Sequence, residues 1–97
     1  MEILEKKYRR NGSFIFRKIA GENILVPVEQ EIVDFQSIFT LNETGAFIWE
    51  KLGGSNTLSK LKDDVSEQFD ITSSQAERDL VDFIAQLQAI NALIETK

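Results

Sequence analysis

A stripe of polar side chains lies near the end of this chain. Gln75, Asp79, Asp82 and Gln86 follow one another at steps of four, three and four residues, the spacing that places side chains on one face of a helix. Phe83 stands beside them in the sequence. Such a stripe can accept hydrogen bonds and hold a cation next to an apolar ring. The simpler interpretation is that Asp79 and Asp82 belong to a solvated helix face.

Groups for covalent or acid–base chemistry are scarce. The chain contains no His and no Cys, which excludes a triad that uses His, a thiolate nucleophile and a disulfide, and removes the commonest zinc ligands. Carboxylates, Lys, Ser, Thr and the single Tyr8 remain, and none lies in a recognisable catalytic motif. We therefore predict a protein that binds a partner and is not an enzyme.

Length and composition predict one small globular domain. The chain has 97 residues, of which 42% are hydrophobic and 28% charged, a composition typical of a folded protein with its own core. Its apolar runs are shorter than the roughly 18 residues that a membrane span requires, and the N-terminus lacks the apolar middle of a secretion signal. The expected location is the cytoplasm, without a membrane partner.

Charge is distributed unevenly along the chain. Residues 1–20 carry six Lys and Arg against two Glu, a net of +4, whereas the remaining residues carry five against fourteen carboxylates, a net of −9. Nucleic-acid affinity comes largely from Lys and Arg that neutralise phosphates, so this acidic body predicts no nucleic-acid partner. We expect a solvated basic tail over residues 1–13 and one domain over residues 14–95.

Three segments predict the strands of an antiparallel sheet. Residues 14–28 contain two β-rich runs separated by Ala20-Gly21-Glu22-Asn23, where Gly and Asn favour the positive φ of a tight turn, so a hairpin is expected. In residues 32–41 apolar side chains alternate with polar ones, as in a strand with one buried face. Gln36 and Thr40 lie on the polar face, and this segment has no Pro that would prevent pairing along its edge.

Three helices are predicted to follow this sheet. Asn42 is a favourable N-cap for the first, which Gly53-Gly54 would end, and the second is expected to begin near Thr57. Thr72 opens a capping box before the longest helix, and Asn91 suits the left-handed conformation at its end. The predicted fold class is α+β, with the helices packed on one face of a small antiparallel sheet.

A set of residues spread over the chain follows one pattern. An apolar strand leads into Leu-Asn-x-Thr, small residues and Ile-Trp, then a helix with Ala-x-x-Asp and Phe, and finally Leu-Ile; the residues are Leu41, Asn42, Thr44, Gly45, Ala46, Ile48, Trp49, Ala76, Asp79, Phe83, Leu93 and Ile94. With the order of the elements, this pattern resembles the PqqD-like family, named for pyrroloquinoline-quinone synthesis protein D. Asn91-Ala92 stand where the family has Gly before Leu-Ile.

The resemblance implies a winged-helix-like domain that recognises the leader segment of a ribosomally made precursor peptide. It also implies presentation of that peptide to a modifying enzyme, often a radical S-adenosylmethionine enzyme. The leader would add as a strand on the edge of the third strand, with side chains in a cleft beside the third helix. The candidate peptide-binding residues are Asp34, Gln36, Ile38, Thr40, Gln75, Asp79, Asp82, Phe83 and Gln86. If the acidic stripe borders the cleft, the leader should carry Lys or Arg near its apolar anchors.

Other functions remain open from the sequence. A winged helix can bind DNA, although residues 70–90 hold one Arg against four carboxylates, a net of −3. An adaptor that docks on an enzyme without binding a leader is a second alternative, and pairing through sheet edges would give a homodimer. Trp49 and Asn42 are interpreted as a core residue and a helix cap rather than as recognition residues.

Overall fold

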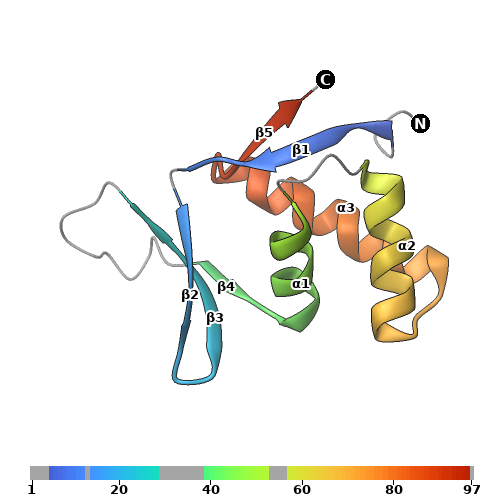
Figure 1. Cartoon of the computed structure of the whole chain (residues 1–97), viewed down its shortest axis with the longest axis horizontal. Helices are drawn as coiled ribbons and strands as arrows, with labels where there is room; N and C mark the ends of the chain where they lie inside the picture. Colours follow the sequence, from blue (N-terminus) through green and yellow to red (C-terminus); the bar gives the residue numbers. More distant parts are fainter. Residues whose placement is uncertain (1–4, 13, 29–38, 53–56, 97) are drawn as a thin grey trace.

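The chain forms a three-stranded sheet, three helices and a separate two-stranded sheet, as seen in a computed structural model that describes residues 5–12, 14–28, 39–52 and 57–96. The elements in chain order (Figure 1) are β1 (Lys7–Arg10), β2 (Phe14–Ile19), β3 (Glu22–Pro27), β4 (Phe39–Leu41), α1 (Glu43–Lys51), α2 (Leu58–Phe69), α3 (Ser73–Ala89) and β5 (Leu93–Thr96). A three-stranded antiparallel sheet followed by three helices confirms the predicted α+β class.

The larger sheet has the strand order β2-β3-β4, with both pairs antiparallel. Ala20 and Gly21 connect β2 to β3 with φ values of 52° and 82°, which fits a two-residue hairpin turn that requires positive φ at both positions. The prediction that Asn23 supplies a positive φ is wrong, because β3 already begins at Glu22. The part of the predicted third strand before Phe39 lies outside the described residues.

One face of this sheet packs on the helices. Leu25 lies in register with Phe16 of β2 and Phe39 of β4, and it is completely buried. Asn23 pairs with Leu41 on the same face, and both are buried. Since side chains alternate along a strand, the neighbouring positions Ile15 and Ile19 of β2 lie on the opposite face and stay exposed.

The predicted helix starts are confirmed by side-chain caps. Asn42 Oδ1 accepts a 2.7 Å hydrogen bond from the backbone N–H of Gly45, and Thr57 Oγ1 accepts one from Lys60 at the start of α2. The Thr72 hydroxyl accepts from the backbone N–H of Gln75 at 3.1 Å. These bonds satisfy donors that lack partners inside the first turn of a helix.

The two ends of α3 differ in how well they follow the prediction. Only half of the expected capping box forms among the described residues: Thr72 accepts the Gln75 N–H, but the Gln75 side chain does not accept the Thr72 N–H and instead donates to Asp79. Asn91 has a φ of 59°, the left-handed conformation predicted for it, and Ala92 N–H donates to the Leu87 carbonyl.

Trp49 of α1 is 3% exposed, which confirms it as a core residue. The predicted stop at Gly53-Gly54 lies outside the described residues.

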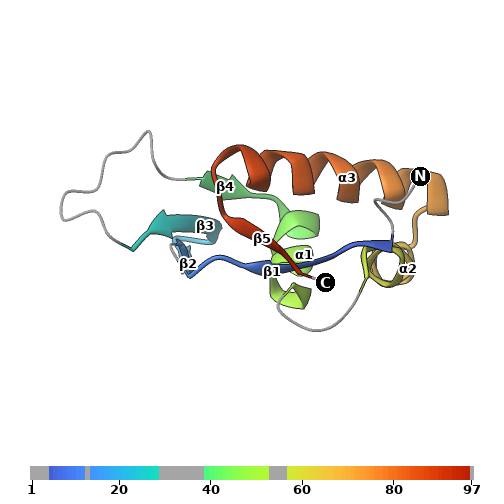
Figure 2. The ribbon, with the colours of Figure 1, turned by 90° about the horizontal axis from the view of Figure 1, so that it is seen from above.

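Residues 7–10 form β1, although the sequence predicted a basic tail for them. β1 pairs with β5 in an antiparallel register from Lys7–Thr96 to Arg10–Leu93, and the two strands cross over one end of α1 (Figures 1 and 2). Tyr8 is 3% exposed and its hydroxyl accepts a 3.3 Å hydrogen bond from Gln88 of α3. Tyr8 is the one buried residue of β1, and a single aromatic residue among charged neighbours is too sparse a signal for the sequence to reveal the strand.

The packing of β1 makes a testable prediction. Tyr8→Ala should lower the free energy of unfolding by about 3 kcal/mol, because it removes a buried aromatic ring from the core. Arg9→Ala, at an exposed position of the same strand, should change it by less than about 0.5 kcal/mol. Urea denaturation followed by circular dichroism measures both. Equal stability of the Tyr8→Ala variant and the unaltered protein would show that residues 7–10 are a tail after all.

Candidate functional site

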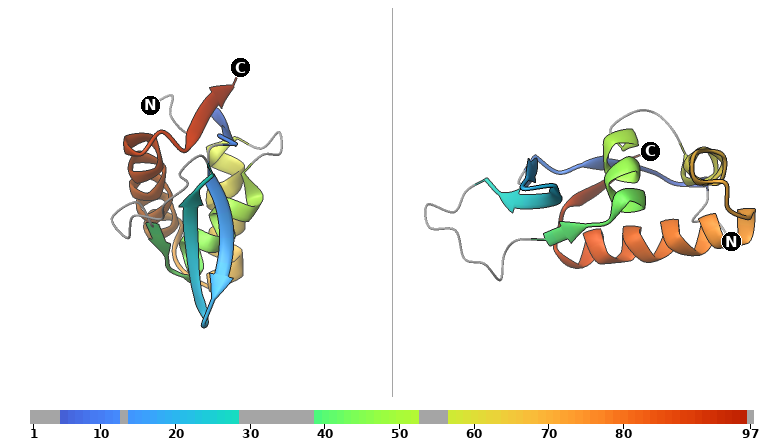
Figure 3. Two further views of the ribbon diagram at one scale, coloured as in Figure 1. Left: turned by 90° about the vertical axis from the view of Figure 1, so that its left-hand side faces the viewer. Right: turned by 90° about the horizontal axis from the view of Figure 1, so that it is seen from below.

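A cleft of about 270 Å³ opens between the edge of the larger sheet and α3. β4 forms one wall, the first turns of α1 form the base, and α3, which runs beside β4 (Figure 3), forms the other wall. The lining residues are Phe39, Thr40, Leu41, Asn42, Thr44, Gly45, Ile48, Asp79, Asp82, Phe83 and Gln86. We call this site the β4–α3 cleft.

Most of the described residues that the sequence predicted for the site come together in this cleft. Those that line it are Thr40, Asp79, Asp82, Phe83 and Gln86. Gln75 is not in the lining, but its Nε2 donates a 2.7 Å hydrogen bond to Asp79 Oδ1 and so orients that carboxylate. Asp34, Gln36 and Ile38 lie outside the described residues.

The apolar floor of the cleft depends on a close contact between two helices. Phe83 is only 8% exposed, and its ring lies against Gly45 of α1. A Cβ atom at position 45 would stand 3.1 Å from Phe83 Cε1 and 3.2 Å from Asn42 Oδ1, both tighter than an ordinary van der Waals contact. The absence of a side chain at Gly45 therefore lets the aromatic ring and the helix cap occupy neighbouring positions.

The charge at the cleft is negative. Asp79 is half-buried and Asp82 is exposed, and neither forms an ion pair with any of the described residues. The lining contains no Lys and no Arg. Two carboxylates beside the Phe83 ring therefore favour a ligand that brings an apolar group and a cation together.

Several lining residues were not among the predicted site residues. Phe39, Leu41 and Ile48 were assigned to the core, and Asn42 to a helix cap, roles that they do have. Thr44 and Gly45 belong to the Leu-Asn-x-Thr motif and the small residues that follow it. This motif was the one feature of the sequence that could have indicated their place in the site. Their position in the cleft depends on how α1 packs on α3, which local sequence does not reveal.

Neither a cluster of metal ligands nor a membrane-spanning helix is found among the described residues. No group of three or more carboxylates, such as could hold a metal ion, gathers among them. None of the helices in the part of the chain that the structure describes is long and apolar enough to cross a membrane.

The fold and the cleft together define a small α+β domain in which β4, the last of the described strands of its sheet, lies beside a helix. Residues 22–93 match the family model described as Coenzyme PQQ synthesis protein D (PqqD). Because this match covers well over half of the chain, the protein belongs to the PqqD family of accessory proteins associated with PQQ synthesis. No curated protein and no solved structure matches the chain.

The contact between Gly45 and Phe83 makes a second prediction. Gly45→Ala should displace the Phe83 ring by a few tenths of an ångström, because the new Cβ meets it at 3.1 Å. Stability should change by less than about 1 kcal/mol, since the better helix propensity of Ala opposes the crowding. Aromatic ¹³C–¹H NMR spectra should therefore show a changed Phe83 signal.

The matched control is Gly12→Ala, because nothing lies within 4 Å of a Cβ added at Gly12. This variant should leave the Phe83 signal unchanged. A Phe83 signal that stays in place in Gly45→Ala would show that the ring is not held by this contact.

Proposed function

We propose that this protein is a non-catalytic peptide-binding module, which recognises the leader segment of a ribosomally synthesised precursor peptide and presents it to a modifying enzyme. The observation that carries the proposal is that Thr40, from an edge strand, lines one cleft with Asp79, Asp82 and Phe83 of α3. Membership of the PqqD family supports it independently. Precursor and modifying enzyme would meet this protein in the cytoplasm.

The leader binds by adding a strand to β4. β4 is the last strand of the sheet and pairs, among the described strands, only with β3, so its other edge can donate and accept main-chain hydrogen bonds. Strands in a sheet lie about 4.8 Å apart, and every second side chain points to the same face. An added strand would thus direct alternate leader side chains toward α3. Main-chain bonds supply affinity, and the cleft selects the side chains.

The lining of the cleft specifies which side chains these are. Phe83 offers a ring to an apolar anchor of the leader, while Asp79 and Asp82 attract Lys or Arg placed near that anchor. The hydrogen bond from Gln75 holds Asp79 in place before the ligand arrives, which lowers the entropy lost on binding. We therefore expect a leader that combines an apolar residue with a basic one.

The modifying enzyme supplies the chemistry in this scheme, and a radical S-adenosylmethionine enzyme is the expected type. The protein itself needs no cofactor to bind and present a peptide. DNA binding is disfavoured because α3 would have to enter a groove of the DNA. Asp79 and Asp82 of this helix are negatively charged, and the phosphates of DNA would repel them. An adaptor that binds only the enzyme would leave the β4–α3 cleft without a ligand.

The third prediction concerns the acidic side of the cleft. Asp82→Lys should weaken binding of the leader by about tenfold, because it replaces attraction of a basic leader with repulsion. The variant should stay folded, since Asp82 is exposed. The measurement is an NMR titration of ¹⁵N-labelled protein with the leader of a short open reading frame beside the gene, and signals of β4 and α3 should shift.

The control Glu67→Lys makes the same charge change at an exposed position of α2 outside the cleft, and it should leave the affinity within about twofold. A DNA duplex should cause no shifts. Unchanged affinity of the Asp82→Lys variant would remove the acidic stripe from the site. A leader that shifts no signal in the unaltered protein would favour the adaptor.

A further inference from the structure

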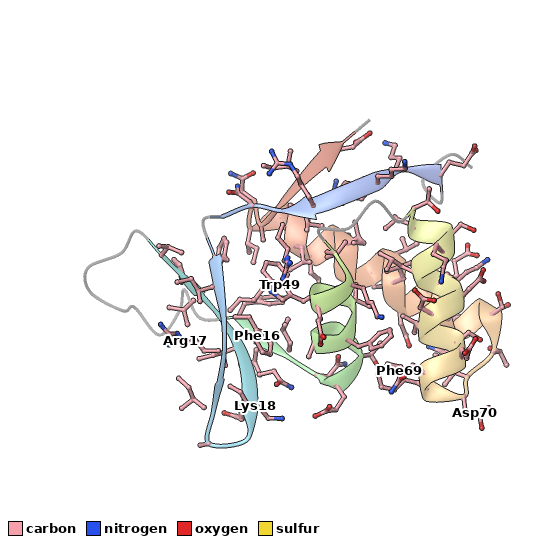
Figure 4. All side chains as sticks on the ribbon, in the orientation of Figure 1. Phe16, Arg17, Lys18, Trp49, Phe69 and Asp70 are labelled. Carbon is pink, nitrogen blue, oxygen red and sulfur yellow. The ribbon has the colours of Figure 1, made fainter. Side chains whose placement is uncertain are left out.

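A second hollow, of about 470 Å³, opens between the β2–β3 hairpin, α1 and α2. Aromatic rings form much of its wall: Phe16 from β2, Phe47 and Trp49 from α1, and Phe69 from α2. In Figure 4, Phe16 and Lys18 lie on the side of β2 that faces α1, and Phe69 reaches toward α1 from α2. We call this site the hairpin hollow.

The hairpin hollow is separate from the β4–α3 cleft. No residue lines both, because α1 presents Asn42, Gly45 and Ile48 to the cleft, and Ala46 and Phe47 to the hollow. Positions on different faces of one helix cannot contact the same small ligand. A ligand in one site therefore leaves the other open.

A buried amide at the hairpin hollow lacks a hydrogen-bond partner among the described residues. Asn23 of β3 lines the hollow and is only 6% exposed. In the part of the chain that the structure describes, no hydrogen bond uses its side chain. No polar side-chain atom of these residues is fully enclosed without a partner. The amide of Asn23 therefore reaches the solvent in the hollow.

The Asn23 amide is suited to bind a ligand. A buried polar group normally has a hydrogen-bond partner, because its removal from water is otherwise unfavourable. The buried Leu41, in register with Asn23 on β4, shows that this face of the sheet accepts an apolar residue. A side-chain amide offers a carbonyl oxygen as acceptor and an NH₂ group as donor. A ligand with an amide of its own can bond to both groups.

The charged side chains of the lining favour an uncharged ligand. Arg10 and Lys18 from the strand side are balanced by Glu43 and Glu50 from α1, so neither an anion nor a cation gains a net attraction. The Arg10 guanidinium also lies 5.8 Å from the centroid of the Trp49 ring, where it forms a cation–π contact within the protein.

The aromatic wall favours a flat, apolar ring. Phe47 and Phe69 pack edge to face with 5.5 Å between their ring centroids, and both pack against the core. Phe16, from the hairpin, is 37% exposed, so contact with a ligand would remove apolar surface from water. Sites that bind small molecules measure roughly 300–1,000 Å³ and combine such walls with a few polar groups. The hairpin hollow has this size and this composition.

We propose that the hairpin hollow binds a small, uncharged aromatic compound that carries an amide. The ring of the compound packs between Phe16 and the pair of Phe47 and Phe69. Its amide donates one hydrogen bond to the Asn23 side chain and accepts another from it. The site is distinct from the β4–α3 cleft, and the proposal does not rest on leader recognition.

The test is an NMR titration of the full ¹⁵N-labelled chain with indole-3-carboxamide. Two matched probes are 3-acetylindole, in which a methyl group replaces the amide NH₂, and indole-3-carboxylate, which is negatively charged. We expect the carboxamide to shift the side-chain NH₂ signals of Asn23 and the indole N–H signal of Trp49, and to leave the Thr40 signal in place. It should bind at least about threefold more tightly than either matched probe, because it alone is uncharged and bonds to both groups of Asn23.

Asn23→Leu should remove this preference, so that indole-3-carboxamide and 3-acetylindole bind within about twofold of each other. The variant should fold, since the Asn23 side chain has no hydrogen bond to lose among the described residues. The control Gln68→Leu removes an exposed amide from the same lining and should keep the preference for the carboxamide.

If Asn23→Leu does not fold, Phe16→Ala is the substitute and should weaken binding of all three probes by about fivefold. Its control, Ile19→Ala, changes an exposed residue on the opposite face of β2 and should leave binding within about twofold. The proposal is overturned if the carboxamide shifts no signal, if it binds the unaltered protein no better than 3-acetylindole, or if its preference persists in Asn23→Leu. Shifts centred on Thr40 would also overturn it, because the compound would then occupy the other cleft.

Discussion

The close approach of α1 to α3 at Gly45 is the constraint on which the β4–α3 cleft of this protein depends. Asn42 caps α1 by accepting the Gly45 N–H at 2.7 Å, and the missing side chain at Gly45 admits the Phe83 ring. These contacts place the start of α1 between β4 and α3. A helix in that position has one face toward the β4–α3 cleft and another toward the β2–β3 hairpin and α2.

Charge at the cleft follows from the same packing. Asp79 and Asp82 of α3 stand at the β4–α3 cleft, whose lining contains no Lys and no Arg. The residues after position 20 carry a net charge of −9, and folding brings part of that charge to the cleft.

The pairing of β1 with β5 covers one end of the core, beside one end of α1 (Figure 1). The backbone carbonyl of Lys6 accepts a 3.0 Å hydrogen bond from the backbone N–H of Leu58 at the start of α2, and Asn11 donates to the carbonyls of Asn91 and Ala92 after α3. Residues near one end of the chain thus fasten the ends of two helices. Contacts so distant in sequence bring a high loop-closure cost, which the buried ring of Tyr8 offsets.

The features that could be predicted from the sequence depend on interactions between residues that are close to one another along the chain. The hairpin, the caps at Asn42, Thr57 and Thr72, and the apolar stripes of the helices depend on turn chemistry, capping and periodicity, which act over a few residues. The acidic stripe of α3 was recognisable for the same reason. The same signals predicted the order of the elements, and the family resemblance added the expectation of a cleft between the third strand and the third helix.

Tertiary structure alone decided the rest. β1 exists because its partner is β5, more than eighty residues away, and Gly45 belongs to the cleft because Phe83 of another helix lies against it. The edge-to-face pair of Phe47 and Phe69 likewise joins two separate helices, α1 and α2. Each of these features depends on a contact between side chains far apart in sequence, and such contacts become definite only when the core packs into one close-fitting arrangement.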